Sequence, residues 1–161
     1  LVTDKALNFL NLKRQKSTRE LPIGGGRGYP KTEEDRKKQI EGLAAWTGFN
    51  KDFLEYLFKR YGTRAEAVAD FMKRAEDAPL KFLPNYTRRE IMFLAQYEKI
   101  HHLDDLILRR TMLAMLGYLT KDILLELADV LGESLGWDAE QKNAEVSRTL
   151  DLLSDRHGVR L

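Results

Sequence analysis

Five charged residues in the middle of the chain are the ones whose types and spacing could form a site. They are Glu98, the acidic pair Asp104 and Asp105, and the basic pair Arg109 and Arg110. Carboxylate and guanidinium groups at this spacing could bind an anionic ligand, contact a partner domain, or pair with one another inside the fold. Asp105 and Arg109 are four residues apart, so on a helix they would form a surface ion pair worth roughly a few tenths of a kcal/mol.

Glu98 and Arg110 are predicted to hold two helices together. Arg110 falls on the apolar stripe of a helix expected at 103–117, and Glu98 falls on the apolar stripe of the helix before it. A charge on a buried face must be paired, because an isolated buried charge costs several kcal/mol. We therefore expect a buried or half-buried ion pair between them. The interpretation favoured here is that this pair fixes how the two helices meet; the other is that it faces a partner domain or an anionic ligand.

Other kinds of chemistry find little support in the sequence. The chain has no cysteine, which excludes a disulfide, a thiolate zinc site and a cysteine nucleophile. His101 and His102 are adjacent and point to different sides, and no HExxH motif occurs, so no metal site is expected. The glycine-rich run at 24–28 could hold a phosphate, but it lacks a preceding strand and a following Lys-Ser/Thr pair. A flexible connector is the expected role of this run.

The elements that must position these residues are predicted to be helices throughout. Capping boxes begin at Thr63 and Thr87, and no stretch alternates with period 2. The expected fold is therefore all-α, a compact bundle of about six to eight helices. The helix at 103–117 is apolar on nearly every face, which places it in the centre of the bundle. The expected helices lie at 2–15, 31–47, 51–61, 64–77, 88–100, 103–117, 121–134 and 139–157.

The composition is that of a globular protein with balanced charge. The chain has 161 residues, of which 43% are hydrophobic and 32% charged, enough to bury a core without a disulfide or metal. Lysine and arginine total 27 against 25 acidic residues, for a net charge of +2, which argues against a nucleic-acid-binding protein. The longest apolar stretch, around 103–118, is interrupted by charges and too short to span a membrane.

Residues 16–30 are predicted to be a linker, because they include four glycines and two prolines. This divides the chain into two expected parts. Residues 1–29 would be the tail of a preceding domain together with the linker, and residues 30–161 would be an all-helical C-terminal domain. The chain begins with Leu1 rather than methionine, which we interpret as a sign that it was cut from a longer protein.

Residues 97–120 and 124–159 resemble the C-terminal domain of the FAD-dependent (aerobic) glycerol-3-phosphate dehydrogenases and alpha-glycerophosphate oxidases. Arg60-Tyr61-Gly62 and the stretch from Ser17 to Gly25 also fit this family. The residues that carry the resemblance are Glu98, the run from Asp104 to Thr111, Leu135-Gly136-Trp137 and Ala144-Glu145-Val146.

The resemblance implies a parent enzyme that oxidises sn-glycerol 3-phosphate to glycerone phosphate and passes a hydride to FAD, with electrons going on to a quinone or to dioxygen. The family's G-x-G-x-x-G fingerprint lies in its N-terminal domain and is absent here. This chain alone is therefore expected to supply no catalytic residue, no cofactor-binding residue and no metal ligand. The residues carried over as structural or interface candidates are Glu98, Asp104, Asp105, Arg109, Arg110 and Thr111.

The expected partner is the N-terminal FAD-binding domain of the same polypeptide, with Arg109 or Arg110 anchoring the junction. The resemblance implies a cytoplasmic parent, and it leaves open a homodimer and peripheral attachment at the cytoplasmic face of a membrane. No nucleic-acid partner is expected. The alternative is a free-standing helical module that binds a protein or peptide in a groove between helices.

Overall fold

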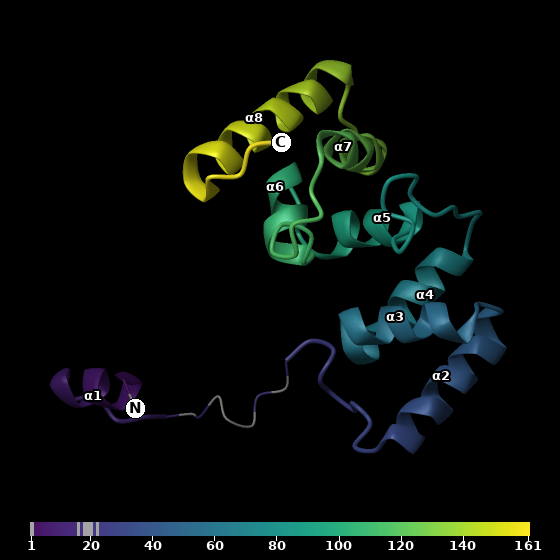
Figure 1. Ribbon diagram of the computed structural model, residues 1–161. Coiled ribbons are helices and arrows are strands. Elements are labelled where there is room, and N and C mark those ends of the chain that lie inside the picture. The colour runs from purple at the N-terminus through teal and green to yellow at the C-terminus, as the bar shows by residue number, and fades with distance from the viewer. Residues whose placement is uncertain (1, 16, 18–20, 22) are drawn as a thin grey trace. The chain divides into compact units, whose positions relative to one another are not determined.

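Helices are the regular elements of this protein (Figure 1). The computed structural model describes residues 2–15, 17, 21 and 23–161, and in these ranges it contains no strand, which confirms the all-α class. Contacts divide the chain into two units, residues 1–66 and residues 67–161, which we call the N-terminal and C-terminal units. The predicted boundary between residues 29 and 30 stays a prediction.

The N-terminal unit is built around a pair of helices, α2 (Glu33–Thr47) and α3 (Lys51–Tyr61), followed by a 3-10 turn at Gly62–Arg64. Helix α2 begins after Thr32, whose side chain accepts a hydrogen bond from the N–H of Asp35. It ends at Gly48, which has a left-handed backbone conformation. The apolar side chains between these helices are buried; they include Ile40, Leu54, Leu57 and Phe58.

Helix α1 (Val2–Phe9) also belongs to the N-terminal unit, and it is shorter than the helix predicted at 2–15. Asn11 has a left-handed backbone with φ 53, and an α-helix cannot continue through that conformation. The helix predicted over 2–15 therefore ends before Asn11.

The C-terminal unit contains most of α4 (Ala65–Lys73), together with α5 (Arg88–Tyr97), α6 (Leu103–Asp105), α7 (Lys121–Leu135) and α8 (Ala139–His157). Helices α5 and α7 lie side by side, and α7 also packs on α8 and α6 (Figure 1). Within the described ranges, no helix is long and apolar enough to cross a membrane. The core of this unit is mostly leucine and isoleucine: Ile91, Leu94, Leu103, Leu106, Ile107, Leu124, Leu127, Leu131 and Leu153.

The central helix predicted at 103–117 is wrong in extent and in character. A single α turn, α6, passes into a π turn at Leu106–Arg110, and residues 111–120 run in turns. The helix ends because Thr111 has an extended backbone, with φ −131 and ψ 169. Its N–H makes the last hydrogen bond of the π turn, to the Leu106 carbonyl at 2.9 Å, and its hydroxyl donates to the same carbonyl at 2.9 Å. The apolar residues expected on all faces of one helix are therefore divided between two segments, the helical one up to residue 110 and the turns at 111–120.

Two further predicted helices end early. The helix expected at 64–77 ends at Lys73, and the one expected at 88–100 ends at Tyr97. Lys99 has φ 52, which places it in the left-handed region and stops the second of these helices. The N-terminus of α8 has the capping box formed by Asp138 and Gln141.

Candidate functional site

Four of the five charged residues singled out from the sequence lie on the short segment formed by α6 and the π turn, which packs against α8 in the C-terminal unit. The fifth, Glu98, lies at the C-terminal cap of α5. We call the segment of residues 101–111 the acidic turn. Its two aspartates are buried, with 5% of Asp104 and 9% of Asp105 exposed. Buried carboxylates must find donors, so their partners define what the acidic turn does.

Asp105 caps the acidic turn and pairs with Arg109. Its Oδ2 atom accepts the backbone N–H groups of His101 and His102, both at 3.1 Å, and its Oδ1 atom accepts Nη1 of Arg109 at 2.8 Å. Burial works to raise the pKa of Asp105, but the two N–H donors and the charge of Arg109 outweigh it and hold the pKa below its usual value. The predicted pair with Arg109 is present, and its acidic member is buried rather than on the surface.

Asp104 pairs with Arg148, a residue of α8 that sequence reasoning missed. Nη1 of Arg148 donates to Oδ1 of Asp104 at 2.6 Å, and the arginine side chain remains 42% exposed. The hydrogen bond to Asp104 raises the pKa of Arg148, and burial opposes it. The signal available in the sequence was indirect: an aspartate within an apolar segment requires a basic partner, but nothing local identifies one 44 residues away.

Glu145 of α8 is the second residue that sequence reasoning did not single out as a site. Its Oε2 atom accepts the N–H of Leu103 at 3.0 Å, and its Oε1 atom lies 2.8 Å from Nδ1 of His102. Arg148 lies 3.6 Å from the same carboxylate. Glu145 therefore satisfies an N–H group at the start of α6 and ties the acidic turn to α8, which gives a physical role to the Ala144-Glu145-Val146 motif.

The expected buried or half-buried ion pair of Glu98 and Arg110 is present, but as a long contact between half-exposed side chains. Nε of Arg110 donates to the backbone carbonyl of Glu98 at 2.8 Å, whereas the Glu98 carboxylate is 3.9 Å away. The Arg110 side chain is 38% exposed and that of Glu98 is 24% exposed. Because the helical segment ends at Arg110, its side chain lies at the end of a turn and not on a buried stripe. It still links the end of α5 to the π turn.

The chemistry of the acidic turn is internal pairing. Asp104, Asp105 and Glu145 each use their oxygens on donors from this chain. Across the described residues, no group of three or more His, Cys, Asp or Glu side chains could hold a metal ion. The most exposed charged group in these pairs is the guanidinium of Arg109, whose side chain is 67% exposed. The acidic turn thus holds the cationic side chain of Arg109 toward solvent through its bond to Asp105.

The glycine-rich segment packs against the end of α3. Gly25 has φ 80 and Gly62 has φ 58. A Cβ atom on either residue would overlap backbone atoms of the segment that contains the other. The N–H of Thr63 donates to the Gly25 carbonyl at 3.0 Å, and its hydroxyl donates to the Arg27 carbonyl at 2.9 Å. For residues 23–29 this corrects the expected flexible connector; residues 16, 18–20 and 22 of the predicted linker lie outside the described residues.

This segment does not fit a phosphate or the pyrophosphate of a dinucleotide. Such a loop needs backbone N–H groups free to face the ligand and a helix N-terminus behind it. Here the first turn of the next helix carries Glu33, Glu34 and Asp35, which repel an anion. The residues present therefore give no support to FAD binding by this chain.

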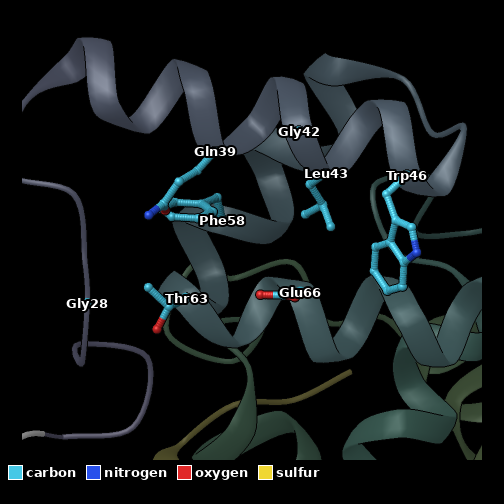
Figure 2. Close-up of a pocket in the computed structure, with 8 residues that line it drawn as sticks. All are labelled: Gly28, Gln39, Gly42, Leu43, Trp46, Phe58, Thr63 and Glu66. Carbon is cyan, nitrogen blue, oxygen red and sulfur yellow. The ribbon is translucent and has the colours of Figure 1, made fainter.

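A hollow of about 450 Å³ opens beside the glycine-rich segment in the N-terminal unit. Figure 2 shows Gln39, Leu43 and Trp46 projecting from α2 on one side, with Thr63 and Glu66 on the other. Gly28, Gly42 and Phe58 complete the lining, and no basic side chain takes part among the described residues. The hollow is suited to neutral groups rather than to a phosphorylated substrate.

Together these features define an all-helical protein in which the carboxylates of the acidic turn hold the fold together. The chain belongs to the family described as the C-terminal domain of alpha-glycerophosphate oxidase, whose match covers residues 16–142. This confirms the resemblance found in the sequence, and the acidic turn lies inside the matched region.

The chain is also similar to part of two longer proteins. The chain is 31% identical over 113 residues to the glycerol-3-phosphate dehydrogenase of Mycobacterium leprae (strain TN), a match covering 68% of this chain and 19% of that protein. It is 26% identical over 164 residues to the probable glycerol-3-phosphate dehydrogenase of Encephalitozoon cuniculi (strain GB-M1), covering 98% of this chain and 25% of that protein. The chain thus spans about a fifth to a quarter of the length of these relatives.

Proposed function

We propose that this chain is the C-terminal accessory domain of an FAD-dependent glycerol-3-phosphate dehydrogenase. The remainder of that protein would bind FAD and oxidise sn-glycerol 3-phosphate to glycerone phosphate. FAD would accept the hydride, and a quinone or dioxygen would receive the electrons. The proposal places the enzyme in the cytoplasm, with any quinone reduction at the cytoplasmic face of the membrane.

The observation that carries this proposal is the family match over residues 16–142, combined with relatives that are both named as glycerol-3-phosphate dehydrogenases. The geometry supports an accessory role. The carboxylates of the acidic turn pair with donors of this chain, and the glycine-rich segment is packed against Thr63. A domain of this kind contributes by binding, with Arg109 held outward for contact with the rest of the enzyme.

The test is to purify the full-length protein and to add sn-glycerol 3-phosphate in the absence of an electron acceptor. We expect a yellow flavin spectrum that is bleached by sn-glycerol 3-phosphate and not by glycerol or sn-glycerol 1-phosphate. The same protein should then reduce a dye acceptor with this substrate. Residues 1–161 expressed alone should be colourless. A full-length protein without flavin, or one that is not bleached, would contradict the proposal.

Arg109→Gln in the full-length enzyme tests the accessory role. Arg74→Gln is the matched control, because Arg74 is also an exposed arginine paired with an aspartate four residues away on a helix of this chain. We expect Arg109→Gln to weaken flavin retention after gel filtration and to leave the KM for substrate unchanged, while Arg74→Gln changes neither. If the native protein has the mass of this chain alone, the free-standing interaction module takes the place of this proposal.

A further inference from the structure

An apolar loop in the C-terminal unit is exposed to solvent. Four large side chains within seven consecutive residues are uncovered: Met112 is 52% exposed, Met115 77%, Leu116 55% and Tyr118 58%. Single exposed apolar residues are ordinary, but a contiguous group of this kind marks a surface that binds something. We call residues 112–118 the methionine loop.

The methionine loop is folded, so its side chains are held outward by its own backbone. The N–H of Leu116 donates to the Met112 carbonyl at 2.9 Å, and that of Tyr118 donates to the Leu113 carbonyl at 3.1 Å. Leu113 is 2% exposed and anchors the loop in the core. Exposure of these apolar side chains to water is unfavourable in free energy, and burial against a partner would remove that unfavourable contribution.

A groove of about 540 Å³ lies between the methionine loop and the C-terminal end of α8. Its floor is apolar, and Arg109 and His157 are its basic members. The Arg109 guanidinium is anchored to Asp105, which fixes its position relative to the groove. Its apolar lining includes Met115, Leu119, Leu153 and Val159.

We propose that this groove and the methionine loop bind the part of the full-length polypeptide that precedes this chain. The inference rests on the proposed function. The relatives are about four to five times as long as the matched region, because this chain covers 19% and 25% of them. A C-terminal domain attached to that much protein has its largest available partner on the same polypeptide, at the high effective concentration that a covalent link provides.

The chemistry of the occupant follows from the lining. The bound surface is apolar at its centre and carries a carboxylate or a helix C-terminus at its edge, facing Arg109. A membrane is a competing occupant, because Arg109, Arg110 and Lys121 flank the loop. The covalent link favours the polypeptide, and the measurement with added vesicles separates the two. A second copy of the chain is the remaining competitor, and the experiment below separates it.

Cysteine labelling in the full-length protein tests the proposal. This chain has no cysteine of its own, so Met115→Cys and the control Leu125→Cys each place one thiol in it. In this chain Met115 is 77% exposed and Leu125, on α7, is 40% exposed. If exposure within this chain alone set the rate, a thiol at position 115 would react with a maleimide faster than one at position 125. We expect the opposite order in the full-length protein, with position 115 at least tenfold slower, at every protein concentration and without lipid. Labelling of position 115 at the faster rate would overturn the proposal.

A photo-crosslinking residue at position 115 identifies what covers the groove. We expect a crosslink within one polypeptide, to a peptide that precedes residue 1. A crosslink to a second copy, a crosslink to residues 23–66, or protection that appears only with added vesicles would each overturn the proposal. These readouts do not depend on catalysis. A protected position 115 in a protein that does not oxidise glycerol 3-phosphate would leave the docking surface standing and reject the proposed activity.

Discussion

Gly25 and Gly62 show how two residues without side chains determine a contact between distant parts of the chain. Each has a positive φ, and each lies so close to the backbone of the other segment that a Cβ atom has no room. The crossing places the Gly25 carbonyl where the Thr63 N–H can reach it. Two motifs quoted from the sequence, the glycine run and Arg60-Tyr61-Gly62, therefore meet for a steric reason.

Gly62→Ala should destabilise the N-terminal unit more than Gly28→Ala does. Gly28 is the matched control, because its φ of 69 is also positive but a Cβ atom there would meet nothing within 4 Å. We expect a loss of about 1 kcal/mol for Gly28→Ala, from backbone strain alone, and at least about twice that for Gly62→Ala. Urea unfolding of both variants measures the difference. Equal losses would mean that the backbone crossing contributes nothing.

Thr149 is a buried polar residue whose replacement should stabilise the protein. It is 0% exposed, and its hydroxyl has no hydrogen-bond partner among the described residues. Thr149→Val keeps the shape and removes the unsatisfied group, so we expect the free energy of unfolding to rise by about 1 kcal/mol. Thr149→Ser keeps the hydroxyl, removes a methyl group and should lower it by about the same amount. If Thr149→Val lowers the free energy of unfolding as much as Thr149→Ser does, the hydroxyl is hydrogen-bonded to a buried water.

At the scale of the residue, the sequence could predict contacts that are local and not those that are distant. The pairing of Asp105 with Arg109 follows from a separation of four positions, and it is present. The partner of Asp104 is on another helix, and spacing gives no guide to it. The pair of Glu98 and Arg110 was placed on buried stripes by assuming a continuous helix, and the side chains are half-exposed because that helix ends.

At the scale of the element, the acidic turn is stabilised by a cap whose strength depends on charge. The folded state holds the pKa of Asp105 below the usual value of 3.8, through the N–H groups of His101 and His102 and the charge of Arg109, against the effect of burial. A lowered pKa in the folded state means that the unfolded chain binds a proton more readily. The stabilisation is therefore complete above about pH 5 and is lost progressively as the pH falls through about 4 and below.

Asp105→Asn should reveal this dependence. The variant keeps one oxygen for the N–H groups but loses the charge that pairs with Arg109. We expect the gap in unfolding free energy between wild type and variant to be constant from pH 7 down to about pH 5, and to shrink as the pH falls below about 4. Urea titrations across this range measure it. Asp151→Asn, at an exposed site on α8, controls for the loss of one carboxylate. A gap that stays constant to pH 2.5 would contradict the assignment.

Helix positions were largely predictable because caps and breakers are local signals. Thr32, Thr87 and Asp138 each cap a helix near its predicted start. The failure at 103–117 has a different origin, because an apolar pattern reports burial and not the hydrogen bonds that continue a helix. The extended backbone of Thr111 ends the helix, while the apolar pattern continues beyond it.

At the scale of the whole molecule, the two units should respond separately to mutation. Gly62 lies in the unit at residues 1–66 and Thr149 in the unit at residues 67–161. We expect Gly62→Ala to speed amide hydrogen exchange in α2 and α3, and Thr149→Val to slow it in α7 and α8, each leaving the other unit unchanged. Mass spectrometry of the exchanged peptides measures both. Changes of equal size in both units would mean that they unfold as one.

The crossing at Gly25 also determines where force enters the N-terminal unit. The hydrogen bonds of Thr63 join the segment before α2, at Gly25 and Arg27, to the end of α3. A force applied to the chain at residue 23 is therefore transmitted first to the end of α3. Helix α2, the next helix in sequence, lies outside that path. Its first turn can unwind without releasing the hold on the preceding segment. The mechanical attachment point of the segment that begins at residue 23 is therefore Thr63, 31 residues beyond the cap at Thr32.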